Sequence, residues 1–395
     1  MNADPIVVAS AVRTPMGGLQ GDLKSFTAPQ LGAVAIRAAV ERSGVQSMAV
    51  DQVLMGNVLS AGTGQAPARQ AALGAGLETR VTCTTLNKMC GSGMQAVLLA
   101  HDLLLADSAS VVVAGGMESM SNAPYLLEKA RAGYRLGHGR LLDHMFVDGL
   151  EDAYDPGSLM GSFAEDCAQA LGLSRAAQDE FAGASLARSL KAAASGAFDN
   201  EIVPLQVPEG KGLRWVSSDE QPPKADAGRI AQLRPVFREG GTVTAANSSS
   251  ISDGAAALVL MRRSEAQRRG LTVLAIIRGH TAFAGAPGAF PTAPIGAIRR
   301  LQERTGWSLG DVDRFEINEA FAVVTLAAMA QLDLPHAKVN VHGGACALGH
   351  PIGASGARII ATLIWALRRQ RLSRGIAAIC IGGGEATAIA IECVY

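Results

Sequence analysis

Short apolar runs alternate with amphipathic segments along most of the chain, and this alternation predicts strands followed by helices. Residues 5–10 and 53–58 are nearly continuous apolar runs, whereas residues 29–42 and 67–75 have the spacing of amphipathic helices. Strands that are apolar on both faces belong to sheets that are covered on both sides. The pattern therefore predicts α/β layers in which two sheets pack through shared helices.

The first and last thirds of the chain resemble each other, which predicts a duplicated fold. Residues 41–53 and 303–315 align without a gap, with a Glu-Arg pair and a glycine at matching positions. In each third a glycine-rich helix start, at 91–93 and at 353–356, leads to an apolar strand that ends in consecutive glycines and a glutamate. Chance similarity between segments rich in alanine and glycine is the alternative. Two similar segments that occur in the same order in both thirds argue against it.

Residues 120–247 lie between the two halves, are richer in glycine, proline and charge, and predict an inserted loop domain. One helix is expected there, from Ser174 to about residue 194, with Ser174 in a capping pattern. Because long excursions from a compact α/β core are usually functional, we expect this domain to cover the active site. The predicted units are residues 1–119 with 248–270, residues 120–247, and residues 271–395.

Composition narrows the classes of partner. Lys and Arg together number 35, as do Asp and Glu, so the formal charge is zero and gives no global attraction for nucleic acid or an anionic membrane. We see no signal peptide and no apolar run long enough to span a bilayer. The six cysteines are scattered, without the spacing of a metal site. We therefore expect a cytoplasmic protein with free thiols and no metal.

Cys90 is the most informative residue, because it stands at the predicted start of a helix within residues 87–96. Unpaired backbone N–H groups and the helix dipole at such a position favour the thiolate, the form that attacks carbonyls. Gly91 and Gly93 leave room for a substrate beside the backbone. On this segment alone, a buried structural cysteine is an equal alternative.

Three further motifs in the last third carry chemistry. They are Asn-Glu-Ala-Phe-Ala at 318–322, the glycine-rich segment 343–356 that contains His350, and Cys-Ile-Gly-Gly-Gly-Glu at 380–385. Each places one polar or nucleophilic side chain at a strand end or a helix start, where ligand crevices of α/β sheets lie. Taken singly, these residues read as a helix cap, a turn histidine and a buried strand cysteine.

Together, these motifs resemble those of the thiolase family, the acetyl-CoA acetyltransferases and 3-ketoacyl-CoA thiolases. The resemblance extends from Val-Arg-Thr-Pro at 12–15 to the final strand. It implies a five-layered αβαβα sandwich, built from two βαβαβαββ halves and an inserted loop domain.

The resemblance also implies a mechanism with no cofactor, since coenzyme A thioesters are the substrates. Cys90 would attack the thioester and hold the acyl group, and His350 would take its proton. Cys380 would be the base or acid at the α-carbon of the second acyl-CoA. Asn318 would hold a water near the enolate, and the N–H groups of Cys90 and Gly382 would stabilise the tetrahedral intermediate.

Substrate contacts follow from the same resemblance. Ser249 matches a residue that contacts pantetheine, and Met160 and Phe237 match tunnel walls. The chain departs from the common pattern at Leu159 and Phe290, which reshapes the acyl pocket. Lys224 with Arg229 would replace the usual basic residue at the nucleotide end; solvated surface charges are the alternative for these two residues. The implied substrate and coenzyme A contacts are Ser249, Met160, Leu159, Phe237, Phe290, Ala320 and Lys224.

These expectations lead to a predicted activity. The chain is expected to condense two acetyl-CoA reversibly into acetoacetyl-CoA and coenzyme A. A degradative 3-ketoacyl-CoA thiolase for longer chains and a non-catalytic acyl-CoA-binding scaffold are the alternatives. The basic segment 129–144 resembles a tetramerisation loop of the family, which predicts a homotetramer assembled as a dimer of dimers; a solvated basic loop is the alternative.

Overall fold

The computed structural model describes residues 4–395. Most of the predicted elements are present with small shifts in their ends. The first half contains β1 (Ile6–Arg13), β2 (Gly17–Gly18), α1 (Ala28–Ser43), β3 (Gln52–Gly56), α2 (Pro67–Gly74), β4 (Thr82–Leu86), α3 (Ser92–Leu105), β5 (Val111–Ser119) and β10 (Ser252–Arg262). After α6 (Arg263–Arg268), the second half contains β11 (Ala275–Ala284), α7 (Ala293–Thr305), β12 (Arg314–Ile317), α8 (Ala322–Leu332), α9 (Ala345–Leu348), α10 (Ile352–Arg369), β13 (Arg374–Ile381) and β14 (Glu385–Cys393).

The segment between the halves is built from hairpins and two helices. It contains β6 (Tyr125–Leu127), β7 (Leu141–Asp143), α4 (Met160–Leu171), α5 (Arg175–Ala194), β8 (Leu205–Glu209) and β9 (Gly212–Val216). The predicted helix is α5, and the Ser174 hydroxyl accepts from the Ala177 N–H as its N-cap. Short helical turns along the chain lie at Ser47–Ala49, Met120–Asn122, Phe146–Leu150, Pro222–Lys224, Ala227–Gln232, Pro287–Thr292, Leu309–Asp311 and His336–Lys338.

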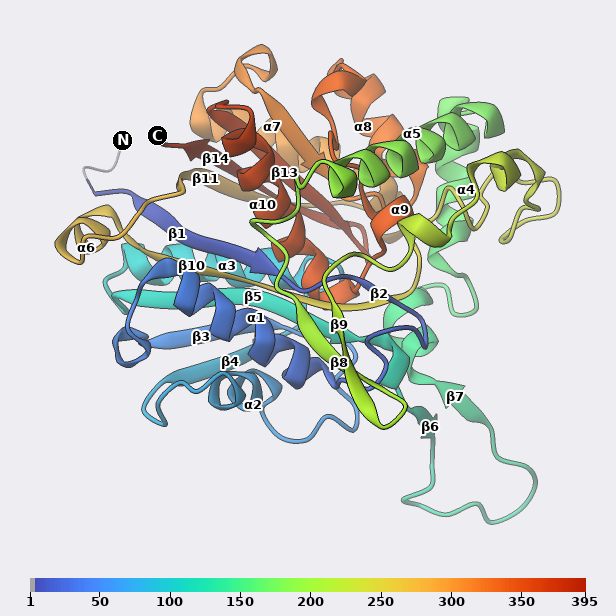
Figure 1. The fold of residues 1–395 in the computed structure, drawn as a ribbon. Coiled ribbons are helices and arrows are strands. Elements are labelled where there is room, and N and C mark those ends of the chain that lie inside the picture. Colours follow the sequence, from blue (N-terminus) through green and yellow to red (C-terminus); the bar gives the residue numbers. More distant parts are fainter. Residues whose placement is uncertain (1–3) are drawn as a thin grey trace.

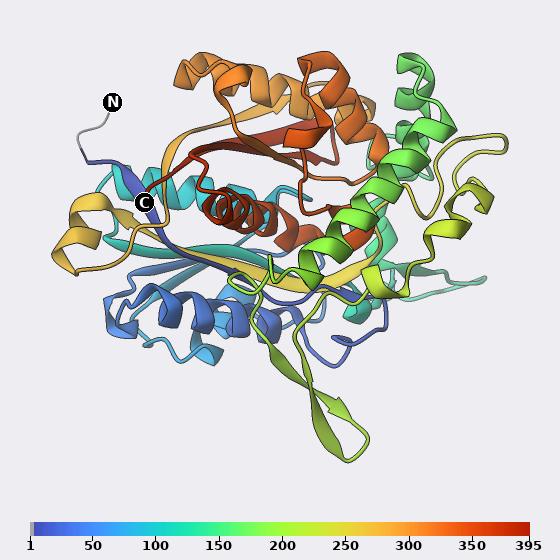
Figure 2. The same ribbon diagram turned by 45° about the horizontal axis from the view of Figure 1, so that its top comes forward.

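Five layers stack as the sequence analysis expected (Figures 1 and 2). Helices α1 and α2 cover the outer face of the first sheet, and α7 and α8 cover the second. Helices α3 and α10 lie between the sheets, where their apolar residues form one buried cluster with both. The strand order is β12-β13-β14-β11-β1-β10-β5-β3-β4, and the two sheets join through a short antiparallel contact of β1 with β11.

The two halves are similar but not identical. The first has β4 parallel to β3, whereas the corresponding place beside β12 holds only a single bridge from Phe315 to Val339. The reason is the next residue, Asn340, whose φ of 47° breaks the extended chain. Its side-chain amide accepts from the Ile317 N–H and donates to the Ile317 carbonyl, both at 2.9 Å. One side chain therefore replaces the backbone pairing of a strand.

Two further expectations are checked by the fold. All six cysteines are free within the described chain. Between residues 4 and 395, none of the helices combines the length and the apolar character needed to cross a bilayer.

Candidate active site

Cys90 lies in the turn between β4 and α3. The helix begins at Ser92 with Gly91 as its N-cap, so Cys90 stands immediately outside the N-terminus. Met89 has a φ of 47°, a left-handed conformation that redirects the chain just before the thiol. A Cβ on Gly91 would lie 2.4 Å from Ile381 Cδ1, so only glycine lets this turn approach the end of β13.

Strand β13 brings a second cysteine to the same place. The backbone N–H groups of Gly382 and of Cys90 itself lie close enough to the Cys90 thiol to lower its pKa. Cys380 is buried, and burial followed by the charge that Cys90 would carry raises the pKa of Cys380. The two thiols therefore lie within electrostatic range of each other. A Cβ on Gly382 would lie 3.6 Å from Met160 Sδ, so the start of α4 covers this backbone.

His350 stands before the central helix of the second half, as Cys90 does in the first. Its backbone N–H donates to the Ser250 carbonyl at 3.0 Å. Its Nδ1 lies 2.5 Å from Ser355 Oγ, and that hydroxyl donates to the Pro351 carbonyl at 3.0 Å. With the hydroxyl proton directed at that carbonyl, the tautomer that fits both contacts carries its proton on Nδ1 and donates to Ser355. The other ring nitrogen, Nε2, is then the acceptor that can receive a proton.

Backbone contact between α3 and α10 sets the relative positions of Cys90 and His350. A Cβ on Gly93 would lie 2.9 Å from both the Gly353 carbonyl oxygen and the Ala357 nitrogen. The first turns of the two central helices therefore meet without intervening side chains. Since each helix starts directly after its functional residue, this crossing places the thiol turn and the imidazole turn side by side.

Asn318 follows β12 and joins the same region. Its N–H donates to the Ala378 carbonyl at 3.0 Å, which extends the parallel pairing of β12 with β13 toward Cys380. Two residues later, the Ala320 carbonyl accepts from the Ser249 N–H at 2.9 Å. Residues 318–320 thus hold the predicted pantetheine-contacting serine against the strand ends.

Three buried polar atoms of these residues lack a hydrogen-bond partner within the described part of the chain: His350 Nε2 and both amide atoms of Asn318. Leaving such an atom unpaired costs about 1–3 kcal/mol. Native structures accept that cost mainly where the atom serves a ligand, a water or a reaction. His350 Nε2 is therefore suited to receive a proton during a reaction, and the Asn318 amide is suited to bind a water or a substrate oxygen.

Aromatic rings from three segments form one wall beside this region. The Phe237 ring occupies the space where a Cβ on Gly161 would lie, 2.3 Å from its nearest atom, and it packs edge-on against Phe321 at 5.9 Å between centroids. Phe290 is buried and lies 6.3 Å from the same ring. Leu159, the N-cap of α4, is partly buried. This part of the predicted substrate set is a compact apolar group.

Lys224 lies apart from that wall. Its ammonium forms an ion pair with Glu220 and is mostly exposed. It lines a cavity of about 350 Å³ together with Arg229, Ser250 and Cys346. The cavity reaches Ser250, whose carbonyl accepts from the His350 N–H, while none of Cys90, His350, Cys380 and Asn318 lines it.

The chain matches two family descriptions, "Thiolase, N-terminal domain" over residues 6–264 and "Thiolase, C-terminal domain" over residues 271–393. The protein belongs to the thiolase family. Acetyl-CoA acetyltransferase 2 of Arabidopsis thaliana is 49% identical over 395 residues, covering 99% of this chain and 98% of the relative. Acetyl-CoA acetyltransferase of Cupriavidus necator is 46% identical, covering 98% and 99% of the two chains.

The same relationship holds in three dimensions. A crystal structure of Bacillus anthracis acetyl-CoA acetyltransferase superposes on this thiolase with a TM-score of 0.96 at 42% identity, covering 99% of each chain. The family and fold inferred from the motifs are therefore confirmed.

The expected thiolate at Cys90 is corrected by the structure. Burial raises the pKa of Cys90 to about 11, and the N–H groups of Gly382 and Cys90 offset it only in part. Burial lowers the pKa of His350 to about 3. Both groups of this thiolase are therefore neutral at pH 7, and the thiol must lose its proton as it attacks.

Alkylation by iodoacetamide can test this protonation state. Only the thiolate reacts, and its fraction grows tenfold per pH unit below the pKa. The rate at Cys90 should therefore rise about tenfold per unit from pH 7 to pH 10. Peptide mapping measures the rate of labelling at Cys90. The Cys380→Ala variant is used so that the second thiol does not react. A rate that levels off below pH 8 would instead reveal a resting thiolate–imidazolium pair.

Glu118 is a positioning residue that the motif analysis noted only as part of the repeat. Its buried carboxylate accepts from the N–H groups of Val58, Leu59 and Gly353, at 3.0, 3.1 and 2.9 Å, and from the Asn57 amide at 2.7 Å. It thus ties the loop after β3 and the end of β5 to the start of α10. No motif in the sequence indicates this contact, because the residues that it joins are far apart in the chain.

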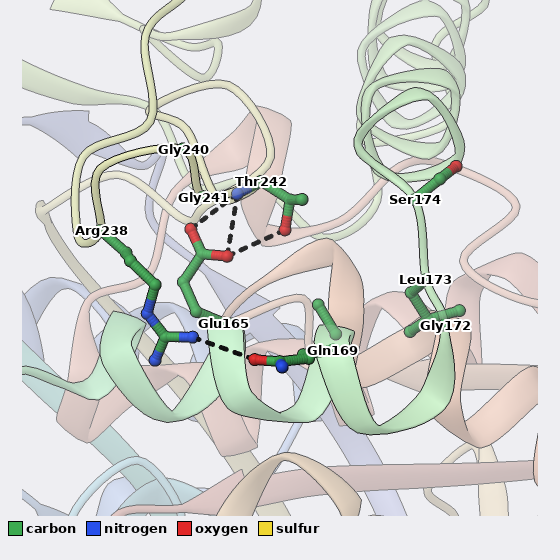
Figure 3. A pocket seen from close by; sticks show the side chains of 10 residues that line it. Glu165, Gln169, Gly172, Leu173, Ser174, Arg238, Gly240, Gly241 and Thr242 are labelled. Atoms are coloured by element: carbon green, nitrogen blue, oxygen red, sulfur yellow. Dashed lines mark hydrogen bonds between the residues drawn. The ribbon is translucent and has the colours of Figure 1, made fainter.

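A second hollow, of about 310 Å³, lies beside α4 (Figure 3). Glu165 holds the opposing loop there, since its carboxylate accepts from the Thr242 and Val243 N–H groups at 2.8 Å. None of the predicted site residues lines this hollow. Its relevance is indirect, because the loop that Glu165 anchors also carries Phe237.

Proposed function

We propose that this thiolase is an acetyl-CoA acetyltransferase, which joins two acetyl-CoA into acetoacetyl-CoA and coenzyme A through an acetyl group on Cys90. The observation that carries the proposal is the meeting of Cys90, His350, Cys380 and Asn318 at adjoining strand ends and helix starts. The names of the full-length relatives support the acetyl specificity.

In the first half-reaction, the Cys90 sulfur forms a bond to the thioester carbonyl carbon while His350 Nε2 takes the thiol proton. The negative charge that develops on the carbonyl oxygen is next to the N–H groups of Cys90 and Gly382, which already point at the sulfur. Donors fixed in advance stabilise such charge without reorganising. The carbon–sulfur bond to coenzyme A then breaks, and the leaving thiolate takes the proton of the buried Cys380 thiol, so that Cys380 becomes the thiolate while His350 stays protonated.

In the second half-reaction, Cys380 as thiolate removes a proton from the methyl carbon of another acetyl-CoA. Its buried position raises the pKa of Cys380, which makes the thiolate a strong base. The enolate oxygen would accept from Nε2–H of the protonated His350 and from a water that Asn318 would hold. The new carbon–carbon bond expels Cys90 as thiolate, which regains its proton from His350, while Cys380 keeps the methyl proton, so all three groups return to their neutral forms.

Coenzyme A would enter through the cavity that Lys224, Arg229 and Ser250 line. The two cations suit its phosphates, and Ser249 and Phe237 would contact the pantetheine arm. Leu159, Met160, Phe290 and Ala320 would surround the acyl end, where the aromatic group leaves little space for a long chain.

Thiolysis of a series of 3-ketoacyl-CoA substrates tests the acetyl specificity. We expect kcat/KM for acetoacetyl-CoA to exceed that for the ten-carbon substrate by at least about tenfold, since one methylene that does not fit its pocket costs roughly 1–3 kcal/mol. Phe290→Leu, which removes one ring of the aromatic wall, should lower this ratio of kcat/KM values. A preference of the unaltered enzyme for long chains would favour the degradative alternative.

We also propose a homotetramer, a dimer of dimers, and a cytoplasmic location. The hairpin β6–β7 projects from the body (Figure 1), and it carries the fully exposed Leu136 along with exposed Tyr125 and Leu141. Strand β4, at the sheet edge, has one side unpaired and is suited to pair with another copy. Sedimentation of the intact protein and of Leu136→Ser would separate tetramer from dimer; an unchanged mass would contradict a role of the hairpin.

A further inference from the structure

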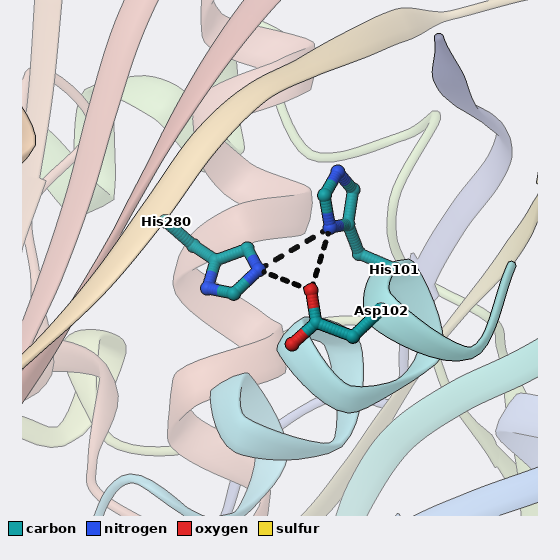
Figure 4. A group of neighbouring side chains, drawn as sticks. All are labelled: His101, Asp102 and His280. Carbon is teal, nitrogen blue, oxygen red and sulfur yellow. Dashed lines mark hydrogen bonds and ion pairs between the residues drawn. The ribbon is translucent and has the colours of Figure 1, made fainter. Parts of the chain in front are cut away.

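Three metal-ligating side chains meet far from the proposed acyl-transfer site (Figure 4). His101 and Asp102 lie near the C-terminal end of α3, and His280 comes from β11 of the other half. His101 is roughly 14 Å along the helix from its start beside Cys90, at 1.5 Å per residue. The cluster is therefore separate from the chemistry described above.

The three donor atoms form a nearly equilateral triangle. His280 Nε2 lies 2.9 Å from Asp102 Oδ1 and 3.2 Å from His101 Nδ1, and His101 Nδ1 lies 3.2 Å from the same carboxylate oxygen. An ion bound at about 2.0–2.1 Å holds its ligands about 2.9 Å apart in octahedral and about 3.3 Å apart in tetrahedral geometry. The triangle matches the face of such a coordination sphere before any ion is added.

Protons alone do not satisfy all three contacts of this cluster. A neutral imidazole has one N–H and one lone pair, so each ring can satisfy only some of these contacts. If both rings donate to Asp102, two N–H groups face each other across 3.2 Å. If one ring donates to the other, the acceptor nitrogen faces the carboxylate. A cation at the centre would satisfy all three donor atoms at once.

The surroundings permit an ion to enter and limit its charge. The Asp102 side chain is 53% exposed, which provides a route from solvent, while the two rings are largely covered. Arg304 is the nearby cation: it donates to the His280 carbonyl at 2.9 Å. Because Arg304 opposes a bound cation and a single carboxylate balances it, a site of moderate affinity is expected.

We propose that His101, Asp102 and His280 bind a divalent transition-metal ion of the zinc class and that this ion clamps α3 of the first half to β11 of the second. Imidazole nitrogens select Zn²⁺, Co²⁺, Ni²⁺ and Cu²⁺ over Mg²⁺ and Ca²⁺, which prefer oxygen. Water would fill the remaining positions. The proposal does not depend on the acyl-transfer mechanism.

Titration of the metal-free, chelator-treated protein with Co²⁺ tests the proposal directly. We expect one equivalent to produce the visible absorption bands of nitrogen and oxygen ligation, without the strong near-ultraviolet bands of cobalt–thiolate bonds. His280→Asn should weaken this binding at least about tenfold, the smallest effect usual for disturbing a metal's ligand environment. His336→Asn, a histidine outside the cluster, should leave it unchanged.

Two further measurements keep the test decisive. Asp102→Asn alters a mostly exposed residue, so it should fold even if His280→Asn does not, and it should also lose the bands. Saturating Co²⁺ should raise the melting temperature of the unaltered protein but of neither cluster variant. Failure of the unaltered protein to bind Co²⁺, equal binding by the cluster variants, or thiolate bands would each overturn the proposal and indicate a purely hydrogen-bonded triad. Acetylation of Cys90 would be unaffected in every case.

Discussion

Replacing Cys90 by alanine is expected to lower the rates of acetyl transfer and of condensation by about 10⁴-fold or more, because both half-reactions pass through its sulfur. Mass spectrometry after incubation with acetyl-CoA should find a gain of one acetyl group on Cys90 of the unaltered enzyme and none on the variant. Stability should change little, since the substitution removes only the sulfur atom.

Cys83→Ala is the matched control for this experiment. Cys83 lies on β4, seven residues before the proposed nucleophile, and is also a partly buried free thiol. It should retain both the adduct and the activity. An adduct that persists in Cys90→Ala, or the absence of any adduct on the unaltered protein, would favour the alternative of a binding scaffold on the thiolase fold.

Removal of Cys380 should separate the two half-reactions. In Cys380→Ala, Cys90 should still acquire an acetyl group, more slowly, whereas formation of acetoacetyl-CoA should fall by about 10²–10⁴-fold, the usual contribution of a general base. Exchange of the methyl protons of acetyl-CoA with deuterated water isolates this step, because it requires proton removal but no carbon–carbon bond. We expect that exchange to be lost together with condensation.

Cys393→Ala controls for the cavity that the substitution leaves. Cys393 is likewise a buried cysteine, on the neighbouring strand β14, so losing its sulfur should cost similar packing energy without touching the reaction. If acetylation of Cys90 falls as far as condensation in Cys380→Ala, the division of roles between the two thiols is wrong. If Cys393→Ala shows the same pattern, the loss reflects packing alone.

Local patterns in the sequence were sufficient for most helices and strands. Helix α5 was predicted to within a residue because Ser174 caps it through a contact three residues away. The absence of a strand beside β12 was not predicted, since residues 338–342 alternate polar and apolar residues as a half-buried strand does. There the outcome depends on Asn340 reaching back to Ile317, a contact between residues 23 positions apart.

The candidate site shows the same limit more sharply. Its principal residues were identified from motifs, whose resemblance to a family supplied the relations between distant segments. The protonation state of Cys90 was predicted wrongly, because the helix start is visible in the sequence while the burial that dominates the pKa comes from distant residues. The cluster of His101, Asp102 and His280 was missed because isolated histidines 179 residues apart form no motif.

The crossing of α3 and α10 has a consequence for the history of this architecture. The thiol comes from one repeat, and the imidazole and second thiol come from the other. If the two repeats were identical, each would have to carry every reacting group. Half of those groups would then lie where no reaction takes place. Joining the repeats in one polypeptide lets each lose what the other supplies, so severing the chain between them should leave two inert fragments that regain turnover only on reassociation.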